Sequence, residues 1–207
     1  MKIYKTVSGN GESEFIEKKS RFISFVYPVT AEKDAVSYIE KARKQFYDST
    51  HVVYAYKLRE NNIARFSDDG EPQGTAGIPV LDVINKSGIE DVLIIVVRYF
   101  GGTLLGAGGL VRAYSKSASL GVENAVVCTM TPCSVFEIKC PYNLLSQVQY
   151  ILDNHLAYKI DIFYMQDITL KYYIEQTKFE NLKNDLFDKT NGCIIAEITA
   201  TEFHKIM

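Results

Sequence analysis

The sequence predicts an α+β protein of two domains, with a boundary near Thr131. Along the whole chain, stretches that alternate like strands are interleaved with stretches that have helical spacing, and the pattern starts again after Thr131. The length of 207 residues also exceeds the roughly 100–150 residues that are commonest for a single domain. We therefore expect one domain at residues 1–131 and a second at residues 132–207.

Composition and charge indicate an ordinary globular protein. Hydrophobic residues make up 47% of the chain and charged residues 23%. The net charge of −2 gives no overall attraction to nucleic acid or to an anionic membrane, so such contacts would need a local basic patch. Neither a secretion signal nor an apolar run of roughly 20 residues is recognisable in the sequence. We expect a cytoplasmic protein that makes no membrane contact.

The cysteines are expected to be small buried hydrophobes. They form no CxxC pair and no zinc-binding spacing, and they lie in apolar stretches that resemble strands. The four are Cys128, Cys133, Cys140 and Cys193. A protein without disulfides follows from this pattern.

The first predicted elements are a strand, a helix and a hairpin. Residues 20–29 are rich in aromatic and β-branched side chains, and Thr30 is placed to cap a helix that follows them. Apolar residues of that helix recur at helical spacing: Val36, Ile39, Ala42 and Phe46. Residues 51–58 alternate like a strand, and a turn at Asn61–Asn62 returns residues 63–67 as its partner.

An acidic loop, a short helix, a buried strand and a longer helix are predicted next. Residues 68–77 form the loop, and Gly88 closes the short helix at its C-cap. Residues 91–97 are apolar without alternation, which predicts a strand covered on both faces. A glycine-rich loop then leads into a helix near residues 107–125.

The helix near residues 107–125 has three distinguishable faces. An apolar stripe comprises Val111, Tyr114, Ala118, Val122 and Ala125. A strip of small residues, able to approach a sheet closely, comprises Ala113, Ser117 and Gly121. The polar face comprises Arg112, Lys116, Ser119 and Glu123.

The second domain shows the order β-α-β-β-α-β. The strand at residues 135–140 precedes a helix with Leu145, Val148 and Leu152 on one face. Two alternating strands, a second helix and a closing strand follow. This order is the split β-α-β pattern of ferredoxin-like folds, so we expect a ferredoxin-like C-terminal domain.

The glycine-rich loop is the main candidate for ligand binding. Its glycines imply positive φ angles or close approach of another group, and amides at the start of the following helix favour an anion. Arg98 and Arg112 flank the loop. The predicted anion-binding residues are Arg98, Gly101, Gly102, Gly106, Gly108, Gly109 and Arg112. Neither the GxxxxGK(S/T) phosphate loop nor the GxGxxG dinucleotide-binding fingerprint is present. A tight strand-to-helix corner is therefore the alternative.

Several other residues are candidates for supporting roles. They are Asp68, Asp69, Glu71, Thr75, His51, Lys19 and Arg21. The three carboxylates are close enough in sequence to hold Mg²⁺, although solvated acidic loops are common. One of them could instead serve as a general acid or base.

Basic residues near Phe22 and Phe25, with Arg65 and Phe66 further on, could bind single-stranded RNA by charge and stacking. The alternative is ordinary strand patterning, in which such aromatics belong to the core.

Three segments together resemble the IMPACT family: EKKSRFI, RFSDDGEPQGTAG and VVRYFGGTLLGAGGLVRAY. The resemblance covers nearly the whole chain, with the signature domain at about residues 1–130. It implies that the N-terminal domain is a β-α-β sandwich like domain 2 of a small-subunit ribosomal protein, a fold shared with elongation factor G and GHMP kinases. It also implies that the C-terminal domain is like the last domain of elongation factor G.

The resemblance implies a role in translation, because eukaryotic relatives are translational regulators that relieve a stress kinase sensing uncharged tRNA. We therefore expect a regulatory protein that contacts RNA, the ribosome or another anionic partner through the glycine-rich loop. An enzyme acting on a phosphorylated small molecule or nucleotide is the alternative. A third hypothesis is a protein-binding module whose sheet exposes Tyr158, Tyr164 and Tyr173.

Overall fold

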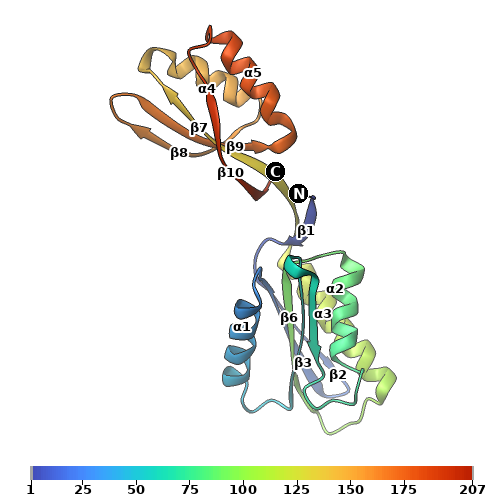
Figure 1. Ribbon diagram of the computed structural model, residues 1–207. Helices are drawn as coiled ribbons and strands as arrows, with labels where there is room; N and C mark the ends of the chain where they lie inside the picture. The colour runs from blue at the N-terminus through green and yellow to red at the C-terminus, as the bar shows by residue number, and fades with distance from the viewer. Residues whose placement is uncertain (1, 207) are drawn as a thin grey trace. The chain divides into compact units, whose positions relative to one another are not determined.

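The chain divides into two compact units. The computed structural model describes residues 2–206 and places Tyr4–Thr129 in the first unit and residues 130–206 in the second, together with residues 2 and 3. Both units are α+β and contain antiparallel strands (Figure 1). The boundary falls within the long strand β7 (Val127–Cys140).

The first unit is built on an antiparallel sheet with the strand order β2-β3-β6-β4-β5. The strands are β2 (Gly11–Glu17), β3 (Ser20–Pro28), β4 (His51–Leu58), β5 (Ile63–Ser67) and β6 (Val92–Tyr99). The central strand β6 pairs with β3 and β4, and every residue of β6 except Tyr99 is buried. The lack of alternation in this strand correctly predicted its burial on both faces.

Helices cover both faces of this sheet (Figure 1). They are α1 (Glu32–Gln45), α2 (Gly77–Ser87) and α3 (Ala107–Ala125). One core lies between the sheet and α1, and the other lies between the sheet and the pair α2 and α3. Gly88 caps α2 in the left-handed conformation, as the sequence predicted.

Several local predictions for the first unit are wrong. The N-cap of α1 is Ala31 and not Thr30. Val36 and Val111 are exposed, because the buried stripes of their helices pass through Ala35 and Ala113 instead. The strands β1 (Tyr4–Val7) and β2 were not predicted, and β1 joins β7 in the second sheet.

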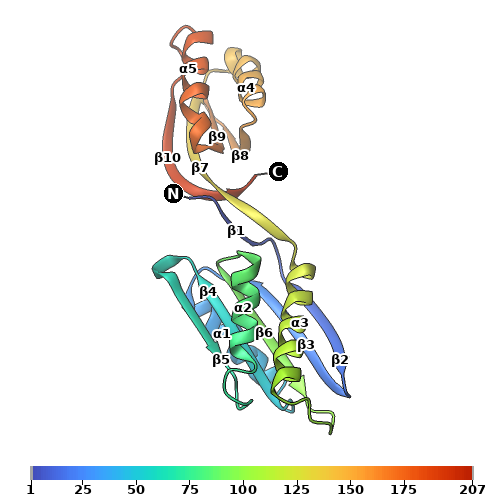
Figure 2. The ribbon, with the colours of Figure 1, turned by 90° about the vertical axis from the view of Figure 1, so that its right-hand side faces the viewer.

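The second unit follows the predicted order of elements. The elements after β7 are α4 (Leu145–Asn154), β8 (Tyr158–Tyr164), β9 (Ile168–Glu175), α5 (Phe179–Lys189) and β10 (Ala196–Lys205). Strand β7 pairs with β9 and β10, and β8 pairs with the other edge of β9. Both helices pack on one face of this sheet, where their apolar side chains form the core (Figure 2).

Three of the cysteines are buried as expected, but Cys193 is exposed because it lies in the segment between α5 and β10. All four are free thiols. Within residues 2–206, no helix is long and apolar enough to cross a membrane.

Substitution by alanine should have opposite effects on stability at two glycines of α3. A Cβ at Gly121 would overlap Ser24 Oγ and lie 2.9 Å from Val26 Cγ2, so Gly121→Ala should destabilise the fold by roughly 1–3 kcal/mol. At Gly108 the nearest atom would be Arg112 Nη1 at 3.7 Å, so Gly108→Ala should stabilise by up to about 1 kcal/mol. Urea unfolding of the full chain measures both. Equal effects would show that α3 does not depend on close approach at Gly121.

Candidate functional site

A buried ion pair lies where strand β6, the acidic loop and helix α3 meet. Arg98 Nη1 donates to Glu71 Oε1 at 2.6 Å, and the Tyr114 hydroxyl donates to the same oxygen at 2.7 Å. Arg98 is only 4% exposed and Glu71 8%. Burial, followed by the charge of Glu71, raises the pKa of Tyr114, so its hydroxyl remains a proton donor.

The other surroundings of Arg98 are aromatic and weakly polar. Its guanidinium lies 5.5 Å from the ring centres of both Phe22 and Phe100, within the range of cation–π attraction. Nη2 donates to Ser20 Oγ at 3.3 Å, whereas Nε is buried and has no hydrogen-bond partner among the described residues. The charge of Arg98 is therefore compensated inside the protein by Glu71, and its predicted role in binding an anion stays a prediction.

The three carboxylates of the acidic loop point to different partners. Asp68 accepts hydrogen bonds from the amides of Gly74, Ala76 and Gly77, at the start of α2. Asp69 pairs with Arg43 at 2.7 Å and accepts from the amide of Val52. Glu71 is held by Arg98. This arrangement does not match the expected Mg²⁺ site, and no cluster of three or more metal-ligating side chains occurs in residues 2–206.

His51 and Thr75 both support the structure of this loop. His51 Nδ1 lies 2.8 Å from the carbonyl oxygen of Asp69, and Nε2 lies 3.7 Å from Glu71 Oε1. A carbonyl can only accept, so Nδ1 carries the proton. The Thr75 hydroxyl donates to the carbonyl of Pro72 at 2.6 Å, which is an internal contact of the loop.

The glycine-rich loop is a tight corner that also leaves amides free. Gly102 and Gly106 have φ angles of 77° and 72°, where other residues are strained. Gly101 allows the chain to pass against the peptide of Lys19, because a Cβ there would overlap the Lys19 carbonyl. Gly108 and Gly109 lie in the first turn of α3. The first amides of a helix have no acceptor within it, and Gly106, the N-cap of α3, provides no side chain to cap them.

The turn between β2 and β3 lies against this corner. Glu17 pairs with Ser20, so Lys18 and Lys19 form a two-residue turn, with φ angles of 45° and 68°. Both lysines are exposed. Nearby, Arg21 donates two hydrogen bonds to Glu14, so its charge is already paired.

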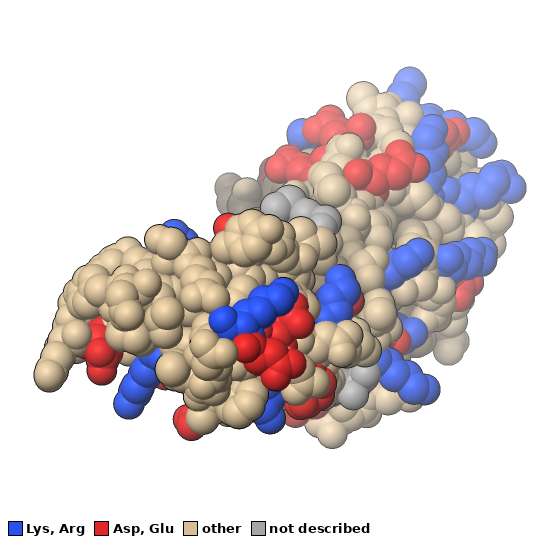
Figure 3. Space-filling view, turned by 90° about the horizontal axis from the view of Figure 1, so that it is seen from above, with Lys and Arg blue, Asp and Glu red and all other residues tan. Residues whose placement is uncertain are grey.

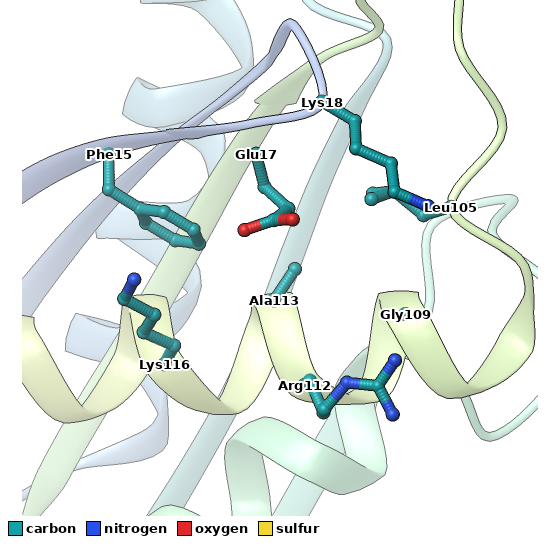
Figure 4. Close-up of a pocket in the computed structure, with 8 residues that line it drawn as sticks. All are labelled: Phe15, Glu17, Lys18, Leu105, Gly109, Arg112, Ala113 and Lys116. Atoms are coloured by element: carbon teal, nitrogen blue, oxygen red, sulfur yellow. The ribbon is translucent and has the colours of Figure 1, made fainter.

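A hollow of about 240 Å³ lies between this turn and helix α3. Its lining includes three cations (Lys18, Arg112 and Lys116) and one carboxylate (Glu17). Figure 4 shows the Glu17 carboxylate pointing into the hollow between Lys116 and Lys18. The ammonium of Lys116 lies 4.8 Å from the ring centre of Phe15.

The structure thus brings only part of the predicted site together. Of the two arginines predicted to bind an anion, Arg112 lines the hollow and Arg98 does not. Phe15 and Glu17 were not predicted as site residues, and Lys116 was recognised only as part of a polar helix face. The alternation of residues 11–17 is the signal that could have placed Phe15 and Glu17 on one face of a strand.

The predicted tyrosines of the second unit are less exposed than expected. Tyr164 is exposed, but Tyr158 and Tyr173 are half-buried. Their rings stack at 5.0 Å between centres, and Tyr173 also stacks on His204 at 3.9 Å. A protein partner for this sheet stays a prediction.

Comparison with known proteins agrees with this arrangement of two units. The Impact N-terminal domain matches residues 18–122, and the domain of unknown function DUF1949 matches residues 138–192. The IMPACT family member YvyE of Bacillus subtilis is 36% identical over 190 residues, covering 91% of this chain and 88% of its own. The family member YigZ of Escherichia coli is 31% identical, covering 86% and 88%.

A crystal structure of a hypothetical protein superposes with a TM-score of 0.62 at 28% identity, covering 97% of this chain and 98% of the other. Fold and sequence together define a two-unit α+β protein with an Impact-type N-terminal domain. The chain belongs to the IMPACT family and is similar to its bacterial members YvyE and YigZ over most of its length.

Removing one partner of the buried ion pair should reduce the stability of the fold more than replacing both partners with apolar residues. Arg98→Met leaves Glu71 without its cation, and Glu71→Leu leaves Arg98 without its anion, so each should destabilise by about 3–5 kcal/mol. The double variant should lose much less than the sum, because neither charge is then left alone. Urea unfolding gives the three values, and additive losses would contradict a direct interaction.

Proposed function

We propose that this protein is a translation-associated binding protein that holds RNA at the hollow between helix α3 and the turn after β2. The observation that carries the proposal is the meeting of Lys18, Arg112 and Lys116 at one hollow beside the uncapped start of α3. Cations gathered around a concave surface are the usual means of binding a phosphate backbone.

The charge balance of the hollow favours an anion. Three cations face one carboxylate, so the lining has a net charge of about +2. All three cations are exposed and free to reach phosphates. The N-terminal end of α3 adds the positive end of a helix dipole to the same region.

The hollow also contains an aromatic group. Phe15 is half-buried and lies on β2, beside the cation of Lys116. The ring also stacks on Phe22 at 5.2 Å between centres, so Phe15 positions the Lys116 ammonium at the hollow, and the cations carry the proposed contact with RNA. On the face shown in Figure 3, acidic and basic side chains are interspersed. Because the whole chain has a net charge of −2, a local hollow lined by cations is a better candidate for contact with RNA than a broad electrostatic surface.

Family membership supports translation as the setting. The chain is 29% identical to the human protein named IMPACT over an alignment of 94 residues, and this alignment covers 44% of the chain. The family resemblance also implies that the second unit is like the last domain of elongation factor G and that the first unit is like domain 2 of a small-subunit ribosomal protein. Some proteins with these folds act at the ribosome, but GHMP kinases share the fold of the first domain, so the fold by itself does not fix the function.

Removing two cations of the hollow should weaken RNA binding and its dependence on salt. For single strands each phosphate contact contributes about 0.7 to the slope of log affinity against log salt, so Arg112→Ala/Lys116→Ala should flatten it by about 1.4. Fluorescence anisotropy with a labelled single-stranded RNA at several salt concentrations measures this slope. Ribosome pelleting tests the same variant on the larger partner.

Lys33→Ala is the matched control, because Lys33 is an exposed lysine of α1, on the opposite face of the same sheet. It should bind RNA as the unaltered chain does. If the wild-type chain binds neither RNA nor ribosomes at low salt, or if all variants bind alike, the proposed function is wrong.

Removing the carboxylate from the hollow should have the opposite effect. Glu17→Gln keeps the shape of the side chain but abolishes its repulsion of phosphate, so RNA binding should strengthen by about 0.5–1 kcal/mol. The same anisotropy titration measures this gain. Glu40→Gln, an exposed change on α1, should leave the affinity as it was. Weaker binding by Glu17→Gln would show that the hollow does not attract anions.

A further inference from the structure

A second hollow lies where strand β6 ends, beside the acidic loop and the glycine-rich loop. Its volume is about 430 Å³, within the range of sites that hold small molecules. None of Lys18, Arg112 or Lys116 lines it, and its lining shares only Leu105 with the hollow assigned to RNA. It is therefore a separate candidate site.

Most side chains around this second hollow are apolar. They are Pro72, Phe100, Leu104, Leu105, Ala107 and Leu110. Leu104 and Phe100 are exposed, although large apolar side chains grouped around a concave surface are unfavourable in water. A ligand with an apolar body would cover both side chains and remove their surface from water.

The Glu71 carboxylate lines the second hollow with one of its oxygens unused. Oε1 accepts from Arg98 Nη1 and from the Tyr114 hydroxyl, whereas Oε2 accepts no hydrogen bond from the described residues. The side chain of Glu71 is only 3% exposed, so water has little access to it. A carboxylate oxygen that is nearly buried and has no donor costs free energy, and a donor on a ligand would recover it.

His51 presents a second acceptor to the same hollow. Its Nδ1 carries the proton that the carbonyl of Asp69 accepts, so Nε2 of the neutral imidazole holds a lone pair. Nε2 lies 3.7 Å from Glu71 Oε1, which is too long for a hydrogen bond, and no described residue donates to it. Two neighbouring acceptors repel each other, and one NH₂ group, which has two donors, can serve both.

The charges of the wall favour a neutral ligand. A carboxylate or a phosphate would face the Glu71 carboxylate and the lone pair of His51 Nε2. An ammonium group would be repelled by Arg98, which also lines the hollow, and by the positive end of α3. Arg98 and Glu71 neutralise each other at 2.6 Å, so a neutral NH₂ group leaves the charge of the site balanced.

We propose that this second hollow binds a small neutral molecule that carries a primary amide on an apolar body. The NH₂ group donates to Glu71 Oε2 and to His51 Nε2, and the body lies against Phe100, Leu104 and Leu110. An alcohol has only one donor, and an aliphatic amine is protonated in neutral water. A primary amide provides two donors without a charge.

Four probes test the proposal on the full chain. Hexanamide has the donors and the body, N,N-dimethylhexanamide has the body without the donors, hexanoate replaces the donors with a negative charge, and acetamide has the donors with almost no body. Chemical-shift titration by NMR should show hexanamide binding at least about fivefold more tightly than each of the other three. The shifts should include the amides of residues 50–51 and 70–71, which do not line the other hollow.

Two variants test the two acceptors. His51→Asn removes Nε2 but keeps a donor for the carbonyl of Asp69, because the NH₂ group of asparagine can take the place of Nδ1. Glu71→Gln keeps an oxygen for Arg98 and Tyr114 and places an NH₂ group where Oε2 was. In each variant hexanamide should bind about fivefold more weakly, while the binding of N,N-dimethylhexanamide stays the same.

A third variant tests the apolar wall. Leu104 is exposed, so Leu104→Asn should fold normally, while the advantage of hexanamide over acetamide should fall several-fold. Lys33→Ala, an exposed change on α1, is the matched control and should leave the binding of hexanamide unchanged.

Equal binding of hexanamide and N,N-dimethylhexanamide would overturn the inference, as would tighter binding of hexanoate or shifts that spare residues 50–51 and 70–71. Unchanged binding of hexanamide to His51→Asn or to Leu104→Asn would overturn the assigned role of that residue. If Glu71→Gln fails to fold, the probes and His51→Asn still decide. Loss of RNA binding would leave this inference intact, because none of the cations proposed to hold RNA lines the second hollow.

Discussion

The pairing of Arg98 with Glu71 is the interaction on which the region around the corner depends. It joins the end of the central strand to the acidic loop, and Tyr114 ties helix α3 to the same carboxylate oxygen. Charges this deeply buried are tolerated only when each has its partner, so the loop and the helix are fixed relative to the sheet. The hollow that Lys18 lines lies beside this corner, because Leu105 of the glycine-rich loop and Gly109 of α3 also line it.

Periodicity predicted most of the fold, because it reports which side of an element faces the core. It gave α3 its observed limits and correctly marked Gly121 as a point of close approach. It missed β2, an edge strand in which polar residues predominate and exposed residues alternate with half-buried ones, so its alternation carries little contrast. It also missed that Arg98 meets Glu71, since these residues are 27 positions apart and periodicity contains no distances between elements.

The candidate site was therefore predicted in outline, but without the internal partners of its charged groups. The glycine-rich loop is a tight corner, as one of the two alternatives expected, and it leads into a helix that has no side-chain cap at its start. Of the two arginines expected to serve it, Arg98 is paired with Glu71, and Arg112 lines the hollow together with Lys18 and Lys116. In sequence such residues resemble any solvated surface, and only the pairing of β2 with β3 brings the turn beside the helix.

The burial of β6 also matters for folding of the chain during its synthesis on the ribosome. Strand β6 is the most continuously apolar segment of the first unit, and exposed segments of this kind promote aggregation. Its partners β3 and β4 both precede it in the chain. During synthesis from the N-terminus, β6 leaves the ribosome after both neighbouring strands are available. The order of the strands thus shortens the time for which this segment is without a partner.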